Sequence, residues 1–184
     1  MASRWQPALA VRLAPRGVVT PRSPLVLVCL LAALVTPSVA FAQKTILLVR
    51  HGERADDTAD AALSPAGEAR ARKLADLLKD AGVTAIFATQ FERTLNTAKP
   101  LADKLGVAIT RLKDTESAEL VASLRTTHRN DVVLVVAHSH TIPEILKLLG
   151  HAPVVTIGAS EFDNLFVIVP RGRNTPPTVV RLRY

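Results

Sequence analysis

The sequence predicts an α/β fold, a three-layer sandwich in which helices cover both faces of a mostly parallel central sheet. Two apolar runs, 45–49 and 132–137, have the length and composition of strands buried on both faces. Segments with leucines at helical spacing alternate with such runs, which is typical of right-handed strand-helix-strand units. Ligands bind at the carboxyl ends of the strands in sheets of this kind, so we expect the functional residues there.

Residues 1–42 have the features of a signal peptide that precedes the folded domain. Four arginines and no acids come first, followed by the apolar stretch Leu25–Val35 and the small-x-small signal Ala40-Phe41-Ala42. The stretch is too short for a comfortable transmembrane helix, which needs about 20 residues. We expect cleavage after Ala42 or after Ala40, a domain at 43–184, and a periplasmic or secreted protein. An uncleaved anchor or a start codon placed too far upstream is the alternative.

Removal of this leader changes what the composition implies. The formal charge falls from +7 to +3, because the leader carries four arginines, and the only cysteine, Cys29, is lost with it. A chain without cysteine tolerates an oxidising compartment, and thiol catalysis and disulfides are excluded. No lysine-rich face with interleaved aromatic residues is present, so nucleic acid is not an expected partner. No stable membrane insertion is expected after cleavage.

The first half of the domain is expected to alternate strands and helices. The elements predicted there are a strand at 44–50, a helix from Pro65 to Gly82, a strand at 84–88, a helix at 93–105 and an edge strand at 107–112. Ser64-Pro65 pairs a hydroxyl N-cap with a proline at the first helical position. Glycines at 82 and 106 follow the two helical patterns, as is typical of helix ends.

The second half continues the alternation and then becomes strand-rich. It is expected to hold a helix at 117–128, a strand at 132–137, a short helix at 141–149, and strands at 164–169 and 178–182. The last two strands flank a segment rich in Gly, Asn and Pro at 170–177, which favours a terminal hairpin or adjacent strands.

Four polar residues are expected to gather at one sheet edge. Arg50 and His51 follow the first strand, His138 follows the strand at 132–137, and Arg93 stands at the start of a helix. A phosphomonoester dianion needs fixed positive charge, a nucleophile in line with phosphorus and a proton for the leaving oxygen. A neutral imidazole with one nitrogen held by a carbonyl can attack through the other, and arginines present planar forks to phosphate. Histidine and arginine together therefore favour phosphoryl chemistry without a metal or other cofactor.

The same residues fall within the motifs of a known family. Arg50-His51-Gly52, Leu63-Ser64-Pro65-Ala66-Gly67, the segment Thr89 to Ala98 around Arg93, and Val136-Ala137-His138-Ser139 stand in order along the chain. This arrangement resembles the histidine phosphatase superfamily, branch 1, whose fold is phosphoglycerate-mutase-like. The resemblance implies that His51 is the phosphohistidine nucleophile, that Arg50 and Arg93 clamp phosphate, and that His138 is the companion histidine.

The proton donor is less defined by the resemblance. Such proteins usually supply a glutamate between the second arginine and the second histidine, and we favour Glu116 over Asp114 and Glu119 because it lies in a loop just before a helix. Glu53 and Asp57, in the loop after His51, are further candidates for the acid. Glu53, Asp57 and Ser139 are also candidates for substrate contacts. Relatives of the mutase type carry asparagine where this chain has Asp57, which indicates a different substrate.

The sequence thus predicts a metal-independent phosphomonoester hydrolase that acts through a covalent phosphohistidine on a small phosphorylated substrate. Mutase or phosphohistidine phosphatase activity is the first alternative, and a catalytically inactive phosphate-binding or envelope interaction protein is the second. A zinc site built from His51, His138 and His140 is disfavoured, since residues 138 and 140 point to opposite faces of an extended chain. The substrate and the oligomeric state are not defined by the sequence.

Overall fold

The computed structural model describes residues 45–171 and 175–184. The expected signal peptide therefore lies outside the described residues. Ten elements follow one another in these ranges: β1 Thr45–Arg50, α2 Pro65–Leu78, β2 Val83–Thr89, α3 Glu92–Leu105, β3 Ile109–Leu112, α4 Ser117–Arg125, β4 Val132–Ala137, α5 Thr141–Leu148, β5 Asn164–Val169 and β6 Thr178–Arg183. No helix in the described ranges is long and apolar enough to cross a bilayer.

Six strands form one mixed sheet in the order β3-β2-β4-β1-β5-β6. The first four strands are mutually parallel, whereas β5 runs antiparallel to β1 and β6 antiparallel to β5. The prediction of a mostly parallel α/β sheet with a terminal hairpin is therefore confirmed. β3 is an edge strand, as expected, and β6 forms the other edge.

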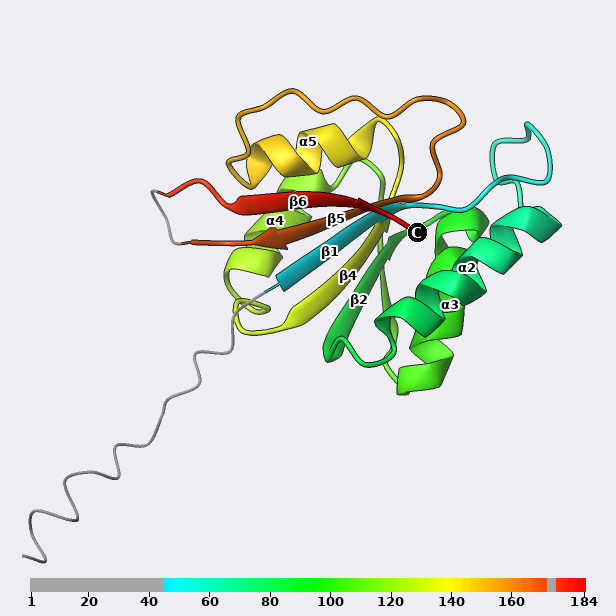
Figure 1. Ribbon diagram of the computed structural model, residues 1–184, viewed down its shortest axis with the longest axis horizontal. Helices are drawn as coiled ribbons and strands as arrows, with labels where there is room; N and C mark the ends of the chain where they lie inside the picture. Colours follow the sequence, from blue (N-terminus) through cyan, green and yellow to red (C-terminus); the bar gives the residue numbers. More distant parts are fainter. Residues whose placement is uncertain (1–44, 172–174) are drawn as a thin grey trace, which may run out of the picture. The chain divides into compact units, whose positions relative to one another are not determined.

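Helices cover the two faces of the sheet in pairs (Figure 1). Helices α2 and α3 lie on one face, where Leu74 and Leu101 are completely buried against β1 and β2 side chains. Helices α4 and α5 lie on the other, where Leu124 and Ile142 are completely buried. Each of these side chains contributes on the order of 2 kcal/mol by leaving water. The central strands are buried on both faces, so their carboxyl ends are held rigidly.

The helix ends largely follow the predicted signals. Ser64 accepts a hydrogen bond from the backbone N–H of Gly67 and caps α2, and Gly106 ends α3 in the left-handed conformation at φ 67°. Helix α2 ends at Leu78, so Gly82 (φ 71°) closes the following turn and not the helix itself. Helix α4 ends at Arg125, three residues earlier than the pattern indicates.

Two glycines bring α2 against the chain that follows β1. A Cβ on Gly52 would lie 2.9 Å from the carbonyl oxygen of Gly67, and a Cβ on Gly67 would overlap the Glu53 carbonyl oxygen. The Ser64 N–H donates to that same Glu53 oxygen at 2.9 Å. The start of α2 therefore fixes the backbone immediately after His51, which is a steric role for the second motif of the sequence.

Candidate active site

The two central parallel strands deliver the two histidines side by side. Arg50 is in register with Ala137, so His51 and His138 directly follow neighbouring strand ends, and the His51 N–H donates to the Ala137 carbonyl at 3.0 Å. Their ring centroids are 5.2 Å apart in an edge-to-face arrangement. Both residues are buried, with exposed fractions of 4% and 3%. The structure thus brings together the two histidines that the sequence places 87 positions apart.

His51 is held in one tautomer. Its Nδ1 lies 2.7 Å from the Gly52 carbonyl oxygen, to which it donates, and no described residue hydrogen-bonds Nε2. Burial lowers the pKa of His51 to about 4. The Gly52 carbonyl opposes this shift, and the charges of three nearby arginines reinforce it. At neutral pH the ring is therefore uncharged, with a lone pair on Nε2.

His138 is fixed by hydroxyl groups. Its Nε2 lies 2.8 Å from the Thr89 hydroxyl, and its backbone N–H donates to the Thr141 hydroxyl at 3.0 Å. Burial, followed by the proximity of His51 and Arg93, lowers the pKa of His138 to about 3, so this ring is also neutral at pH 7 before an anion binds. An oxyanion beside it would favour the protonated form.

Arg50 and Arg93 share an unusual bonding pattern. Arg50 Nη1 donates to the carbonyls of Gly158 (2.9 Å), Ala159 (2.9 Å) and Glu161 (3.2 Å), and Arg93 Nη1 donates to the Ala59 carbonyl at 2.8 Å. In both residues Nε is buried and has no hydrogen-bond partner. Because Nε and Nη2 form one edge of the planar guanidinium, each arginine keeps that edge for a bidentate acceptor.

Each of these arginines also lies on a phenylalanine. Arg50 Cζ is 3.9 Å from the Phe162 ring centroid, and Arg93 Cζ is 4.3 Å from that of Phe91. Phe162 also packs on His51, with centroids 6.1 Å apart, and Phe91 packs on His138 at 5.3 Å. The two phenyl rings therefore orient a cation and an imidazole on each side of the site. Phe162 carried no signal in the sequence, because its contact with Arg50 spans more than 100 positions.

Arg54 is a third cation that the sequence analysis did not select. Its charge lowers the pKa of His51, Arg50 and Arg93, although burial is the larger cause for each of them. Its Nη2 donates to Asp57 Oδ1 at 2.8 Å, and the Asp57 side chain is 98% exposed. Asp57, a candidate substrate contact, thus pairs with Arg54 at the surface.

The Glu53 carboxylate is paired with Arg70 of α2. Its carboxylate accepts two bonds from Arg70 Nε, at 3.0 and 2.9 Å, and one from Nη2 at 2.5 Å. Arg70 Nη1 in turn reaches the carbonyl of Tyr184, whose phenol is buried. The Arg70 hydrogen bonds lower the pKa of Glu53. Because Arg70 hydrogen-bonds both oxygens of this carboxylate, Glu53 is held toward α2 and is not free to approach a leaving group at His51.

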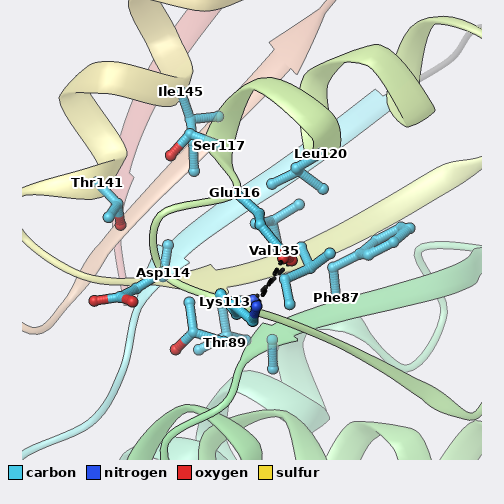
Figure 2. A pocket seen from close by; sticks show the side chains of 14 residues that line it. Phe87, Thr89, Lys113, Asp114, Glu116, Ser117, Leu120, Val135, Thr141 and Ile145 are labelled. Carbon is cyan, nitrogen blue, oxygen red and sulfur yellow. Dashed lines mark hydrogen bonds and ion pairs between the residues drawn. The ribbon is translucent and has the colours of Figure 1, made fainter.

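The acids Asp114 and Glu116, which precede α4, line a small cavity (Figure 2). Its lining includes Thr89 and Thr141, the two hydroxyls that hold His138, together with Asp114 and Glu116. Glu116 Oε2 accepts from the Lys113 N–H at 3.0 Å, and Figure 2 shows its carboxylate turned toward Lys113. The Glu116 carboxylate therefore bonds to Lys113 and not to His51 or His138.

Asp114, unlike Glu116, interacts electrostatically with His138. Its carboxylate accepts a bond from Gln90 Nε2 at 3.1 Å, which is the main cause of its lowered pKa, and His138 contributes to the same shift when its ring is protonated. Burial lowers the pKa of Arg93, and the Asp114 carboxylate, together with Asp60, opposes this shift. Glu119 lies exposed on α4. Among the acids considered, Asp114 is the one that interacts with both a candidate catalytic histidine and a candidate phosphate clamp.

The chain turns between His138 and His140, contrary to expectation. Residues 139 and 140 lie in a turn and His140 precedes α5 in a helical conformation, so the rings of His138 and His140 stack, with centroids 5.4 Å apart and planes at 12°. The prediction that they point to opposite faces is wrong, because it assumed an extended backbone. Ser139 lies half-buried between them. In residues 45–171 and 175–184, no group of three or more His, Cys, Asp or Glu is arranged to hold a metal ion.

Comparison with known proteins agrees with the motif pattern. Residues 46–117 match the model of the histidine phosphatase superfamily (branch 1), which confirms the resemblance inferred from the sequence. No curated protein matches the chain in sequence.

Solved structures of phosphatases share the fold. The protein histidine phosphatase SixA, complexed with tungstate, has 20% identity and a TM-score of 0.59, with 76% of this chain and 96% of that one covered. A mycobacterial glucosyl-3-phosphoglycerate phosphatase in complex with VO3 has 15% identity and a TM-score of 0.61, covering 77% and 98%. A putative alpha-ribazole-5'-P phosphatase from Escherichia coli has 13% identity and a TM-score of 0.62, covering 77% and 97%. Identities this low indicate a common fold.

Proposed function

We propose that this chain, similar over residues 46–117 to the histidine phosphatase superfamily, is a phosphatase that hydrolyses phosphomonoesters through a covalent phosphohistidine on His51. The observation that carries the proposal is the pair of buried, unpartnered Nε atoms on Arg50 and Arg93, beside two neutral histidines. A buried donor without a partner costs about 1–3 kcal/mol, and an oxyanion between the arginines would satisfy both donors. Two phosphatases of the same fold bind tungstate or vanadate, which are oxyanions similar to phosphate.

The proposed reaction has two steps. His51 Nε2 attacks phosphorus, the bond from phosphorus to the ester oxygen breaks, and an acid donates its proton to the departing alkoxide. Water then attacks the phosphohistidine, the same group takes a proton from that water, and inorganic phosphate leaves with His51 restored. Arg50 and Arg93 hold the equatorial oxygens in both steps, and His138 becomes protonated beside the dianion and donates a further bond.

The proton donor is proposed among the acids before α4. Asp114 is supported by its electrostatic interaction with His138 and Arg93, while Glu116 is supported by its place in the loop that precedes α4. The positive charges of Arg50, Arg93 and Arg54 supply the compensation for the phosphate that a metal provides in other phosphatases. We therefore expect the activity to persist after treatment with a chelator.

Hydrolysis of p-nitrophenyl phosphate tests the enzyme class. Wild-type protein is expected to release phosphate steadily in the presence of EDTA, and His51→Ala is expected to release none. Rapid quenching of the wild-type reaction should trap acid-labile, base-stable phosphate on residue 51. Phosphate binding without hydrolysis would instead support the alternative of an inactive binding protein.

A panel of substrates separates the remaining alternatives. Sugar, nucleotide and lipid phosphates, a phosphohistidine peptide and a bisphosphate-primed mutase assay cover the classes that the chain is expected to meet. Mutase activity is disfavoured because mutases of this fold usually carry longer insertions over the site. A preference for the phosphohistidine peptide would favour the function named for SixA.

Export is proposed from residues 1–42 alone. Expression with its own leader in a bacterial host should yield a periplasmic or secreted chain that begins at Gln43 or Phe41, as measured by N-terminal sequencing. A full-length chain in the cytoplasm would contradict the proposal.

A further inference from the structure

The loop between α5 and β5 holds one of the two candidate phosphate clamps. Residues 149–163 contain no helix or strand and cross from α5 back to the sheet (Figure 1). Loops of about 15 residues without secondary structure are uncommon in compact domains, and an ordered loop of this kind often has a functional role. Here three of the loop's carbonyls bind Arg50 Nη1, and Phe162 lies beneath the guanidinium. The orientation of Arg50 therefore depends on the conformation of this loop.

Glu161 closes the part of the loop that touches Arg50. Its Oε2 accepts the backbone N–H of Gly158 at 2.7 Å, and its own N–H donates to the Gly158 carbonyl at 3.1 Å. These two bonds make a turn from 158 to 161. The carbonyls that bind Arg50 belong to Gly158, Ala159 and Glu161, so all three are in that turn.

The same carboxylate ties the turn to the edge strand β6. Glu161 Oε1 accepts from Arg183 Nη2 at 2.5 Å, and Oε2 accepts from Arg181 Nη2 at 3.2 Å. Arg181 Nε also donates to the side chain of the buried Asn164 at 2.6 Å, and Arg183 Nη1 donates to Asp163 at 2.6 Å. Two arginines of one strand thus hold the turn, and each has a second anchor in the sheet or beside it.

We propose that Glu161 is a positioning residue for phosphate binding, which acts through Arg50 by fixing the 158–161 turn against β6. The inference rests on the proposed function. Without the Glu161 carboxylate the turn loses one of its two internal bonds and both ion pairs, and keeps only the backbone bond from Glu161 to Gly158. The three carbonyls that bind Arg50 Nη1, and Phe162 beneath the guanidinium, are then no longer held in place. The edge of the Arg50 guanidinium formed by Nε and Nη2 is then no longer held in the orientation that binds phosphate. Glu161 itself touches no substrate in this scheme.

A double-mutant cycle tests the proposal. The inhibition constant of inorganic phosphate is measured against p-nitrophenyl phosphate hydrolysis for wild type, Glu161→Ala, Arg50→Ala and the double variant. Glu161→Ala is expected to weaken phosphate binding about tenfold, the loss of roughly one charged hydrogen bond. Because Glu161 acts through Arg50, the double variant should bind phosphate no more weakly than Arg50→Ala.

Two further variants make the cycle decisive. Glu68→Ala removes an exposed glutamate that pairs with Arg72 on α2 and is expected to match wild type. Glu161→Gln keeps an acceptor for the Gly158 N–H but loses the ion pairs, so an intermediate inhibition constant is expected, and this variant replaces Glu161→Ala in the cycle if the alanine variant does not fold. Circular dichroism of each variant confirms that it is folded.

The results separate this inference from the proposed function. A Glu161→Ala protein that binds phosphate as well as Glu68→Ala does, or a full tenfold loss that persists in the Arg50→Ala background, would overturn the positioning role. An inactive wild type that does not bind phosphate would overturn the proposed function itself.

Discussion

Acidification is expected to destabilise this protein through its two buried histidines. Burial is the main cause that lowers the pKa of His51 from 6.5 to about 4 and that of His138 to about 3. In the unfolded chain both rings titrate near 6.5. As the pH falls below 6.5, the unfolded state gains protons that the folded state does not bind, so the free energy of unfolding falls, and for His51 it continues to fall to about pH 4.

The size of the effect follows from the linkage relation. A lowering of the pKa from 6.5 to about 4 corresponds to about 3 kcal/mol of stability lost at pH 4, and the value for His138 is of the same order. Small domains have about 5–15 kcal/mol in total, so the loss is a large part of the stability. Above pH 6.5 the two rings contribute no dependence on pH.

Urea unfolding followed by far-UV circular dichroism measures this directly between pH 7 and 4. The His51→Gln/His138→Gln double variant is the control, because it removes both titrating groups and keeps the carboxylates. The free energy of unfolding should fall more steeply in wild type than in the control below pH 6.5. Equal pH dependence in the two proteins would refute the argument that the imidazoles are buried and neutral.

Three other variants test separate parts of the site. Gly67→Ala places a Cβ against the Glu53 carbonyl oxygen, so we expect a loss of about 1–3 kcal/mol in thermal unfolding together with lower kcat/KM, and an unchanged Tm would contradict the close packing. Arg93→Lys loses the planar fork, so KM for p-nitrophenyl phosphate should rise about tenfold with little change in Tm, whereas a changed Tm alone would indicate a structural role. Asp114→Asn should lower kcat by about 100-fold if Asp114 is the proton donor, with Glu116→Gln near wild type, and the reverse result would assign the donor to Glu116.

Much of the site could be predicted because local signals and sheet topology agree. The apolar runs that end at Arg50 and Ala137 are strands buried on both faces, and parallel neighbours present their carboxyl ends at one edge. The histidines that follow these strands therefore meet without any knowledge of the loops. Gly106 was likewise readable as a helix end, since its position demands the left-handed conformation.

The parts that were not predictable depend on contacts between distant segments or on loop conformation. Phe162 and the turn at 158–161 meet Arg50 across more than 100 positions, and nothing in their local sequence indicates a partner. The stacking of His140 on His138 follows from a turn that the apolar pattern of the preceding strand does not specify. The pairing of Glu53 with Arg70 depends on how α2 packs against the chain that follows β1.

Tyr184 is half-buried, with a buried hydroxyl, and it is the only tyrosine of the chain. The whole sequence has one tyrosine and one tryptophan, and the tryptophan, Trp5, lies in the expected leader. The Arg70 Cζ atom lies 6.0 Å from the Tyr184 ring centroid. The same guanidinium donates hydrogen bonds to the Glu53 carboxylate. Tyrosine emission from a chain that begins at Gln43 therefore reports on the region around Arg70 and Glu53, so quenching experiments can follow local unfolding there without an introduced label.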